Sequence, residues 1–237
     1  MEISEWTDSE KEKQEILELT KKTYGNDAEI SNSSYFNWQY RDNPQGKAVI
    51  LLAYDELNHN QIIGTNTIIP ISLLIDQDKI LSSLACNVQV HPDHQKKRIF
   101  SKLLSSMSTE AKIKKISSLF AIPNDNSFHA FINEGSSEII HLPLLIRPIH
   151  LSRYFNSPIN KIIKIFDNHW KVKSSSLDMI EEFNGNFQHF EKLLQKISKR
   201  VSIIQNRNKE YLKWRYLDHP TRKYQIFILK QNDELVG

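Results

Sequence analysis

The segment from residue 82 to residue 116 constrains the fold most, because it reads as a strand, a turn and a helix in immediate succession. Residues 82–90 are short, mostly apolar and end in a Val-Gln-Val alternation, which is typical of a strand with one buried face. Pro92 ends that pattern. Apolar residues then recur at the spacing of an amphipathic helix: Ile99, Phe100, Leu103, Leu104, Met107, Ala111 and Ile116.

The turn between strand and helix is basic, with Lys96, Lys97 and Arg98 in a row. Cations at a helix start oppose the helix dipole, each by roughly 0.3–1 kcal/mol, and they surround N–H groups that lack an intrahelical partner. A bound anion would relieve both problems, as in the phosphate sites of several nucleotide and cofactor folds. The alternative for so short a run is a solvated basic turn or a patch for RNA.

Val90-His91-Pro92 and Gln95 resemble the motif of the GCN5-related N-acetyltransferase (GNAT) superfamily, which reads Val-x-Pro, two residues, then Gln/Arg-x-x-Gly-x-Gly/Ala. Residues 99–104 are similar to the first helical turn of members whose motif ends in Gly-Ile-Phe. Where members usually carry glycine at the second and fourth positions of the turn, this chain carries Lys96 and Arg98. Glycine lets the backbone approach the coenzyme A pyrophosphate without an intervening Cβ, whereas these residues offer charge.

The resemblance implies an α/β (α+β) fold with a GNAT-type mixed, mostly antiparallel central sheet flanked by helices. The local patterns agree with the first half of that fold. They predict strands at 2–6, 47–54, 62–75 (interrupted at Pro70), 79–90, 118–122 and 138–146. They predict helices that begin after Asp8 or Ser9, after Ser33-Ser34 and at Ile99, and further helices over 126–134 and 177–200.

A repeat indicates how the chain is divided. Residues 211–220 echo residues 35–44, with Tyr, Trp, Tyr, Asp and Pro shared, and residues 224–229 then repeat the strand that follows. We predict a GNAT-type acyl-CoA-binding domain at 1–153. Residues 154–237 would hold a linker, a helix and the start of a second, incomplete GNAT-like lobe. We expect the chain to be truncated or to borrow structure from a partner, a homo-oligomer included.

The resemblance also implies a reaction, the direct transfer of an acetyl group from acetyl-CoA to an amine. Strand backbone would pair with the pantetheine arm, the turn and helix head would hold the pyrophosphate, and Asn124 stands where members often carry an asparagine beside that arm. Phe131 falls where many carry the tyrosine that protonates the leaving thiolate, so no catalytic residue is assigned. The implied cofactor-binding set is Val88, Gln89, Val90, Gln95, Lys96, Lys97, Arg98, Ile99, Phe100 and Asn124.

Composition narrows the class of protein. A single cysteine, Cys86, excludes an intrachain disulfide and favours a reducing compartment. The polar first fourteen residues do not resemble a signal peptide, and the longest apolar run, 139–149, is too short and broken to cross a bilayer. We therefore expect a cytoplasmic protein without membrane contact. A net charge of +3 and a pI near 8.8 are mild for a nucleic-acid-binding domain but suit an anionic cofactor.

Several alternatives remain open from the residues alone. His91 and His94 would make a two-histidine metal site, although no Cys or carboxylate stands at ligand spacing, so no metal is predicted. Cys86 reads as a small buried residue rather than a nucleophile. The leading function is an N-acetyltransferase acting on a small-molecule or protein amine. A GNAT-like binding or assembly module without catalysis is second, and an RNA-binding protein third.

Overall fold

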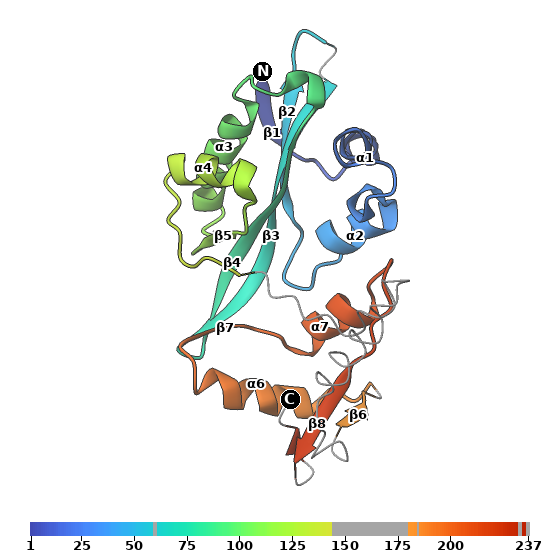
Figure 1. Cartoon of the computed structure of the whole chain (residues 1–237), viewed down its shortest axis with the longest axis vertical. Helices are drawn as coiled ribbons and strands as arrows, with labels where there is room; N and C mark the ends of the chain where they lie inside the picture. The colour runs from blue at the N-terminus through green and yellow to red at the C-terminus, as the bar shows by residue number, and fades with distance from the viewer. Residues whose placement is uncertain (59–60, 144–179, 184, 232–233, 236–237) are drawn as a thin grey trace, which may run out of the picture.

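The computed structural model describes residues 1–58, 61–143, 180–183, 185–231 and 234–235 (Figure 1). A long sheet in the order β1-β2-β3-β4-β5 forms its centre. Its strands are β1 (Glu2–Glu5), β2 (Val49–Asp55), β3 (Gln61–Ile75), β4 (Asp78–Val90) and β5 (Leu119–Ala121). Neighbours are antiparallel except for β4 and β5, which run parallel. The predicted mixed, mostly antiparallel sheet is confirmed.

Helices cover both faces of this sheet (Figure 1). One face carries α1 (Glu10–Tyr24) and α2 (Ser33–Tyr40), joined by the 3-10 turn η1 (Glu29–Ser31). The other carries α3 (Ile99–Ile113) and α4 (Asp125–Asn133). Because successive strand residues point to opposite faces, each face has its own core. Leu51, Ile68, Leu103 and Leu104 are buried on the α3 side, and Leu17, Phe36, Ile50 and Leu52 on the α1 side.

Gly64 lets α3 approach the sheet closely. A Cβ at this position would lie 3.1 Å from the Gln89 carbonyl oxygen and from side-chain carbons of Ile99 and Leu103. Since Gly64 pairs with Val90, this contact fixes the first turn of α3 against the end of β4. The predicted strand, turn and helix are therefore held as one packed unit.

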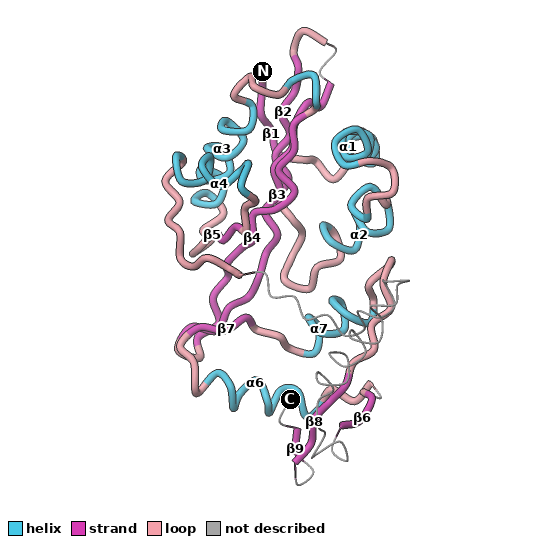
Figure 2. The backbone as a smooth tube through the Cα atoms, in the orientation of Figure 1, coloured by secondary structure: helices cyan, strands magenta, loops and turns pink. Residues whose placement is uncertain are grey.

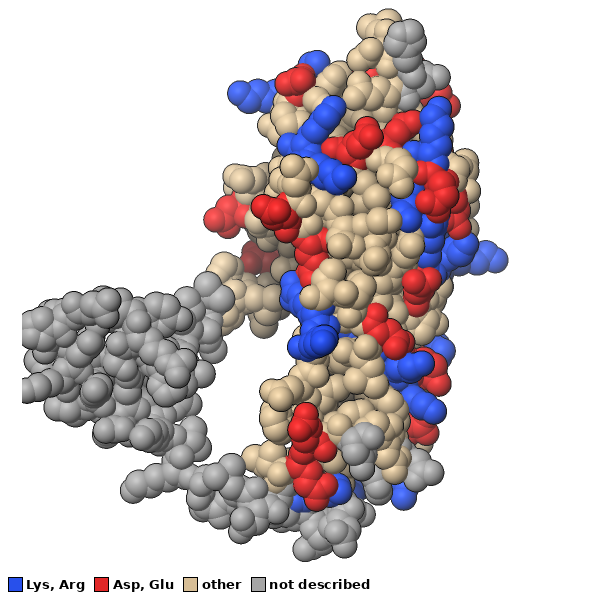
Figure 3. Space-filling model, turned by 90° about the vertical axis from the view of Figure 1, so that its right-hand side faces the viewer, with Lys and Arg blue, Asp and Glu red and all other residues tan. Residues whose placement is uncertain are grey.

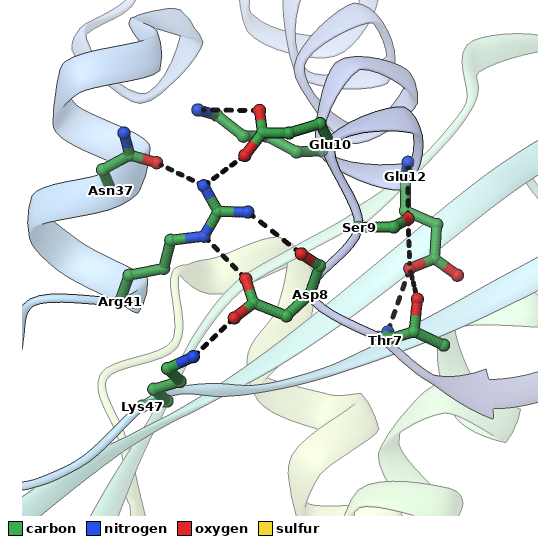
Figure 4. Close-up of polar contacts among 9 residues, drawn as sticks. Thr7, Asp8, Ser9, Glu10, Glu12, Asn37, Arg41 and Lys47 are labelled. Carbon is green, nitrogen blue, oxygen red and sulfur yellow. Dashed lines mark hydrogen bonds and ion pairs between the residues drawn. The ribbon is translucent and has the colours of Figure 1, made fainter.

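An ion-pair network joins the start of α1 to the end of α2 (Figure 4). Arg41 donates from Nε to Asp8 Oδ1 and from Nη1 to Glu10 Oε1, each at 2.6 Å. Lys47 Nζ reaches the other Asp8 oxygen at 2.5 Å. Ser9 caps α1, as predicted, by accepting a hydrogen bond from the Glu12 backbone N–H at 3.2 Å. The network holds both helices at the edge where β1 ends.

Two details of the first half differ from the sequence prediction. Asn32 caps α2 in place of the predicted Ser33 and Ser34, because its side chain accepts hydrogen bonds from the backbone N–H groups of Ser34 and Tyr35. Pro70 does not interrupt β3, where it pairs with Ser83. The Ser83 N–H donates to Ser118 of the opposite neighbour, so this antiparallel pair exchanges no hydrogen bonds and the missing proline N–H weakens no ladder.

Two predictions further along are wrong within the described residues. Residues 138–143 form no strand; Ile139 is 80% exposed, and no described strand pairs with this segment. The remainder of that predicted strand, 144–146, lies outside the described residues. Over the predicted helix 177–200, the chain instead forms strand β6 (Ile180–Glu182) before helix α6 (Gln188–Ser198), and 177–179 lie outside the described residues.

The second half builds a small antiparallel sheet in the order β6-β8-β9, with β8 (Phe227–Gln231) and β9 (Glu234–Leu235) (Figure 2). Between α6 and β8 come β7 (Ile203–Gln205), helix α7 (Lys209–Leu212) and the π-helical turn η5 (Lys213–Leu217). Strand β7 pairs with the far end of β3 and so attaches the second half to the first sheet. In the described part of the chain, no helix is long and apolar enough to cross a membrane.

The two segments with matching sequences lie against each other. Trp38 of α2 and Trp214 of η5 stack with ring centroids 4.6 Å apart, and each indole Nε1 donates to the other residue's backbone oxygen at 2.8 Å. Asn208 caps α7 as Asn32 caps α2. Apart from β7, which lies between α6 and α7, the element order β6, α6, α7, β8, β9 also repeats β1, α1, α2, β2, β3. The proposed domain boundary at residues 153 and 154 lies outside the described residues.

Candidate functional site

Strand β4 carries a bulge near its end. Thr65 of β3 pairs with Gln89 and Thr67 with Cys86, so one residue of β3 lies opposite both Asn87 and Val88. Asn87 has a φ of 52°, and its Nδ2 donates to the Tyr40 hydroxyl at 2.6 Å. A bulge bends its strand and re-aims the following residues. Here it interrupts the ladder at Asn87 and Val88, after which Gln89 and Val90 pair with Thr65 and Gly64 again.

Beyond this bulge β4 and β5 separate. Their parallel pairing covers only Ser83–Ala85 with Leu119–Ala121. Ile122, the next residue after β5, is 73% exposed. Within the described residues, Cys86–Val90 therefore have no strand partner on the β5 side, and this stretch is called the free edge below. The two strands thus part after Ala85 and Ala121, and the place between Cys86–Val90 and the chain that follows Ala121 is called the gap below.

The turn after β4 presents unpaired backbone amides. It begins with the 3-10 turn η2 (Pro92–His94), and the first helical hydrogen bond of α3 runs from the Lys102 N–H to the Arg98 carbonyl. No described residue accepts a hydrogen bond from the N–H groups of residues 96–101. The Lys96, Lys97 and Arg98 side chains are exposed and form no ion pair within the described residues. The result is an electropositive helix head with open donors.

Lys96 and Arg98 both adopt the left-handed conformation, with φ of 63° and 60°. These are the two positions at which the resemblance predicts glycine. The backbone thus keeps a shape that glycine adopts most easily, although both residues carry long side chains. What changes at these positions is the side chain, not the path of the chain.

The structure brings most of the predicted cofactor-binding residues to one place. Val88, Gln89 and Val90 end the free edge, and Gln95 to Phe100 follow directly in the turn and helix head. The Gln89 side chain points the other way, because its Nε2 donates to Thr20 of α1 at 2.9 Å in a buried position. Its backbone faces β3 as well, because the His91 N–H two residues further on donates to Ile63 and Gln89 itself pairs with Thr65. Only Val88 and Val90 therefore turn backbone groups toward the free edge.

Asn124 has a structural task in the unliganded chain. It caps α4, with Oδ1 accepting from the Ser127 backbone N–H at 3.1 Å and from the Ser127 hydroxyl at 2.9 Å. Its Nδ2 forms no hydrogen bond within the described residues, and the residue is exposed just beyond the end of β5. The amide thus keeps a free donor near the gap.

Phe131 cannot act as a proton donor. It is 7% exposed, belongs to the α3-side core and packs edge-on against Phe100 with ring centroids 6.4 Å apart.

Burial raises the pKa of the Cys86 thiol to about 12, which keeps it protonated and unreactive as a nucleophile, as its sequence position predicts. Burial, and then the charge of Lys22, lowers the pKa of His91. The described residues contain no cluster of three or more potential metal ligands.

Two contacts at the candidate site were not predicted from the sequence. Tyr24, the last residue of α1, donates its hydroxyl to the Val88 carbonyl at 3.4 Å, and Asn87 is held by Tyr40 of α2. Each joins residues more than forty positions apart. No periodicity or motif indicates such contacts, because they depend on how the α1 and α2 layer lies on β4.

Comparison with known proteins identifies the family. Residues 6–129, just over half of the chain, match the profile of the acetyltransferase (GNAT) domain. The chain belongs to the GNAT acetyltransferase family. The predicted superfamily is thereby confirmed. Among proteins with curated descriptions, none matches this GNAT chain.

Solved structures share its fold at low sequence identity. N-myristoyltransferase from Saccharomyces cerevisiae, with bound myristoyl-CoA, aligns with a TM-score of 0.55 and 13% identity over 99% of this chain and 56% of its own. Aminoglycoside 6'-N-acetyltransferase from Acinetobacter haemolyticus gives 0.46 and 19%, over 63% of this chain and 99% of its own. Glucosamine-6-phosphate N-acetyltransferase from Arabidopsis thaliana gives 0.46 and 13%, over 62% and 100%. The alignment with the yeast enzyme thus spans nearly the whole of this GNAT chain, and the two proteins share a fold over that length.

Proposed function

We propose that this GNAT protein is an N-acetyltransferase that transfers the acetyl group of acetyl-CoA to an amine. The observation that supports the proposal is the continuity of the free edge of β4 with the open amides of residues 96–101. An extended ligand with a diphosphate at one end and amide groups along its length would match both parts. Acyl-CoA, the donor used by the family, has that form.

Each part of the site has a task in this proposal. The pyrophosphate binds the amides at the head of α3, with charge supplied by Lys96, Lys97 and Arg98. The pantetheine amides pair with backbone groups of Val88 and Val90, as a further strand would, and Asn124 offers its free Nδ2. The thioester is then held still while the amine attacks it, so that orientation lowers the barrier.

A binding measurement tests the cofactor site. We expect the triple variant K96A/K97A/R98A to bind CoA roughly tenfold more weakly at low salt, with a difference that shrinks as salt rises, because exposed charges are screened within a Debye length of about 10 Å at 0.1 M. The matched control is K192A/K199A/R200A, which removes two lysines and one arginine exposed on or after α6. Equal affinity of both variants and the wild type would contradict the site.

A turnover measurement tests the reaction. We expect thiol release from acetyl-CoA to depend on an added amine, in a panel of small amines, amino sugars and peptides. Myristoyl-CoA belongs in the same assay, because the yeast N-myristoyltransferase that shares the fold was solved with it. CoA binding without thiol release from any pair of substrates would favour the binding-module alternative.

The RNA-binding alternative gains no support from the face of the molecule that carries α1 and α2. Figure 3 shows acidic and basic side chains of the described residues interspersed on the face that carries α1 and α2. An RNA site normally presents a continuous basic patch or stripe. RNA that stabilised the protein more than CoA at low salt would reverse this preference.

A further inference from the structure

The proposed reaction needs a proton donor that the usual position does not supply. When the amine displaces the thiol, the C–S bond breaks with its electron pair on sulfur, and protonation of that sulfur eases the step. At the position where the resemblance expects a tyrosine, Phe131 is buried against Phe100 and carries no exchangeable proton. If the protein turns over, another group serves, or the thiolate leaves unassisted.

The fold indicates where the sulfur would lie. With the pyrophosphate at the head of α3, the pantetheine arm continues from it along the residues that precede the turn, which are the free edge of β4. Pairing with β5 closes the gap at Ala85 and Ala121. The reactive end of the cofactor therefore reaches the gap's closed end, beside the bulge at Asn87 and Val88.

One side-chain hydroxyl of the described residues touches the backbone of that stretch. Tyr24 Oη donates to the Val88 carbonyl at 3.4 Å, from the α1 face of the sheet. The residue as a whole is 47% exposed, so Tyr24 is open to solvent. At 3.4 Å the bond is long, and the hydroxyl can exchange it for a better partner that enters the gap.

We propose that Tyr24 is the catalytic acid of this protein and protonates the departing CoA thiolate in place of a residue at position 131. The inference rests on the acetyltransferase function proposed above. The amine nitrogen bonds to the carbonyl carbon, the C–S bond breaks with its electron pair going to sulfur, and the Tyr24 hydroxyl gives its proton to that sulfur. The nitrogen releases its proton to solvent, and solvent returns one to the tyrosinate.

Other groups near the bulge fit the role less well. Tyr40 is buried, and its hydroxyl already accepts a hydrogen bond from Asn87 Nδ2 at 2.6 Å. Cys86 is enclosed between β4 and the α1 side, with no base or charge as partner. Burial, with a smaller effect of Cys86, raises the pKa of the Tyr24 hydroxyl, so it carries its proton at neutral pH.

The test replaces the hydroxyl and keeps the ring. We expect Y24F to lower kcat about a hundredfold, within the range for general acids, while the Kd of acetyl-CoA changes less than twofold. Y54F is the matched control, because the Tyr54 hydroxyl bonds to Glu12 at 3.2 Å, away from the free edge. In the Y24F background, F131Y should recover part of kcat, with melting curves verifying that both variants fold.

A binding experiment addresses the same contact without turnover. Desulfo-CoA lacks the sulfur, so the ratio of its Kd to that of CoA reports on groups that touch sulfur. We expect CoA to bind about threefold tighter than desulfo-CoA in the wild type and in Y54F, and equally in Y24F. Unchanged ratios together with unchanged kcat would overturn the role of Tyr24.

Other outcomes separate the two proposals. Tighter CoA binding with faster turnover in Y24F would show that Tyr24 blocks the gap, and would overturn its role as acid. A wild-type protein that binds CoA but acetylates no amine would overturn the proposed enzyme, while the desulfo-CoA ratio would still decide whether Tyr24 meets the sulfur. A wild-type protein that does not bind CoA would overturn both.

Discussion

At the scale of single residues, Lys96 and Arg98 carry the largest conformational cost in the candidate site. A left-handed conformation costs a residue with a Cβ roughly 1–2 kcal/mol, and these two residues adopt it within three positions. Because both side chains are exposed, they bury no apolar surface that would offset this cost. In the proposed site, these two residues would offer a ligand charge beside open amides.

This cost makes a prediction about stability. We expect K96G and R98G each to raise the free energy of unfolding by about 1 kcal/mol, because glycine adopts the left-handed region without a steric penalty. Urea denaturation followed by circular dichroism measures the effect. The matched control is K97G in the same turn, where φ is not positive, so glycine there only adds freedom to the unfolded chain. If all three variants destabilise the protein alike, strain at Lys96 and Arg98 is not the reason.

At the scale of elements, the strands and helices whose formation depends on neighbouring residues in the sequence could be predicted from local patterns. The strand ending at Val90 and the helix beginning at Ile99 follow from residue spacing and from Pro92. The conformations of Lys96 and Arg98 could be anticipated only through the resemblance, because members of the family usually carry glycine at these two positions. The contacts of Tyr24 with Val88 and of Asn87 with Tyr40 were missed, since they arise from packing between distant segments.

The two wrong secondary-structure predictions, at residues 138–143 and 180–182, have a related cause. Residues 138–143 are apolar enough for a strand, yet a strand needs a neighbour with which to pair, and the described chain provides none there. Conversely, residues 180–182 lie in a segment of helical composition but pair with β8. Composition predicted the wrong state in both places because pairing decides it.

The junction of α1 and α2 predicts a pH dependence. The hydrogen bond from Lys47, and next the contacts with Arg41, hold the pKa of the Asp8 carboxyl below its ordinary value. A group whose pKa is lower in the folded than in the unfolded state stabilises the protein above the unfolded value. That stability is lost as the pH falls through the folded value.

We therefore expect the wild type to lose stability steeply as the pH falls below about 4. In D8N, the free energy of unfolding should be lower at neutral pH and should change less across the acid range. Denaturant titrations at a series of pH values measure both. D27N is the control, because Asp27 is exposed and forms no ion pair within the described residues. A D8N curve parallel to the wild type would show that the network does not control acid stability.

At the scale of the whole molecule, several contacts between described residues hold the second half against the first. Strand β7 extends the pairing of β3, Arg222 forms an ion pair with Glu29 at 2.5 Å, and Trp38 stacks on Trp214. His219 lies against the same stack, with its ring centroid 4.2 Å from that of Trp38. Except for the β7 pairing, these contacts are made with α2 or η1 of the first half. The second half therefore packs against α2, whose residue Tyr40 accepts the hydrogen bond from Asn87.

The tryptophan pair predicts how strongly the halves are coupled. We expect W38F and W214F each to lower the free energy of unfolding by about 1 kcal/mol beyond the loss of ring volume, because each removes one 2.8 Å hydrogen bond and leaves a carbonyl unpaired. W6F is the matched control, since the buried Trp6 Nε1 has no partner to lose. In the double variant the losses should be less than additive, because each substitution changes the ring on which the other tryptophan stacks. Strict additivity would mean that the two rings do not stabilise each other and that this stack does not couple the two halves of the chain.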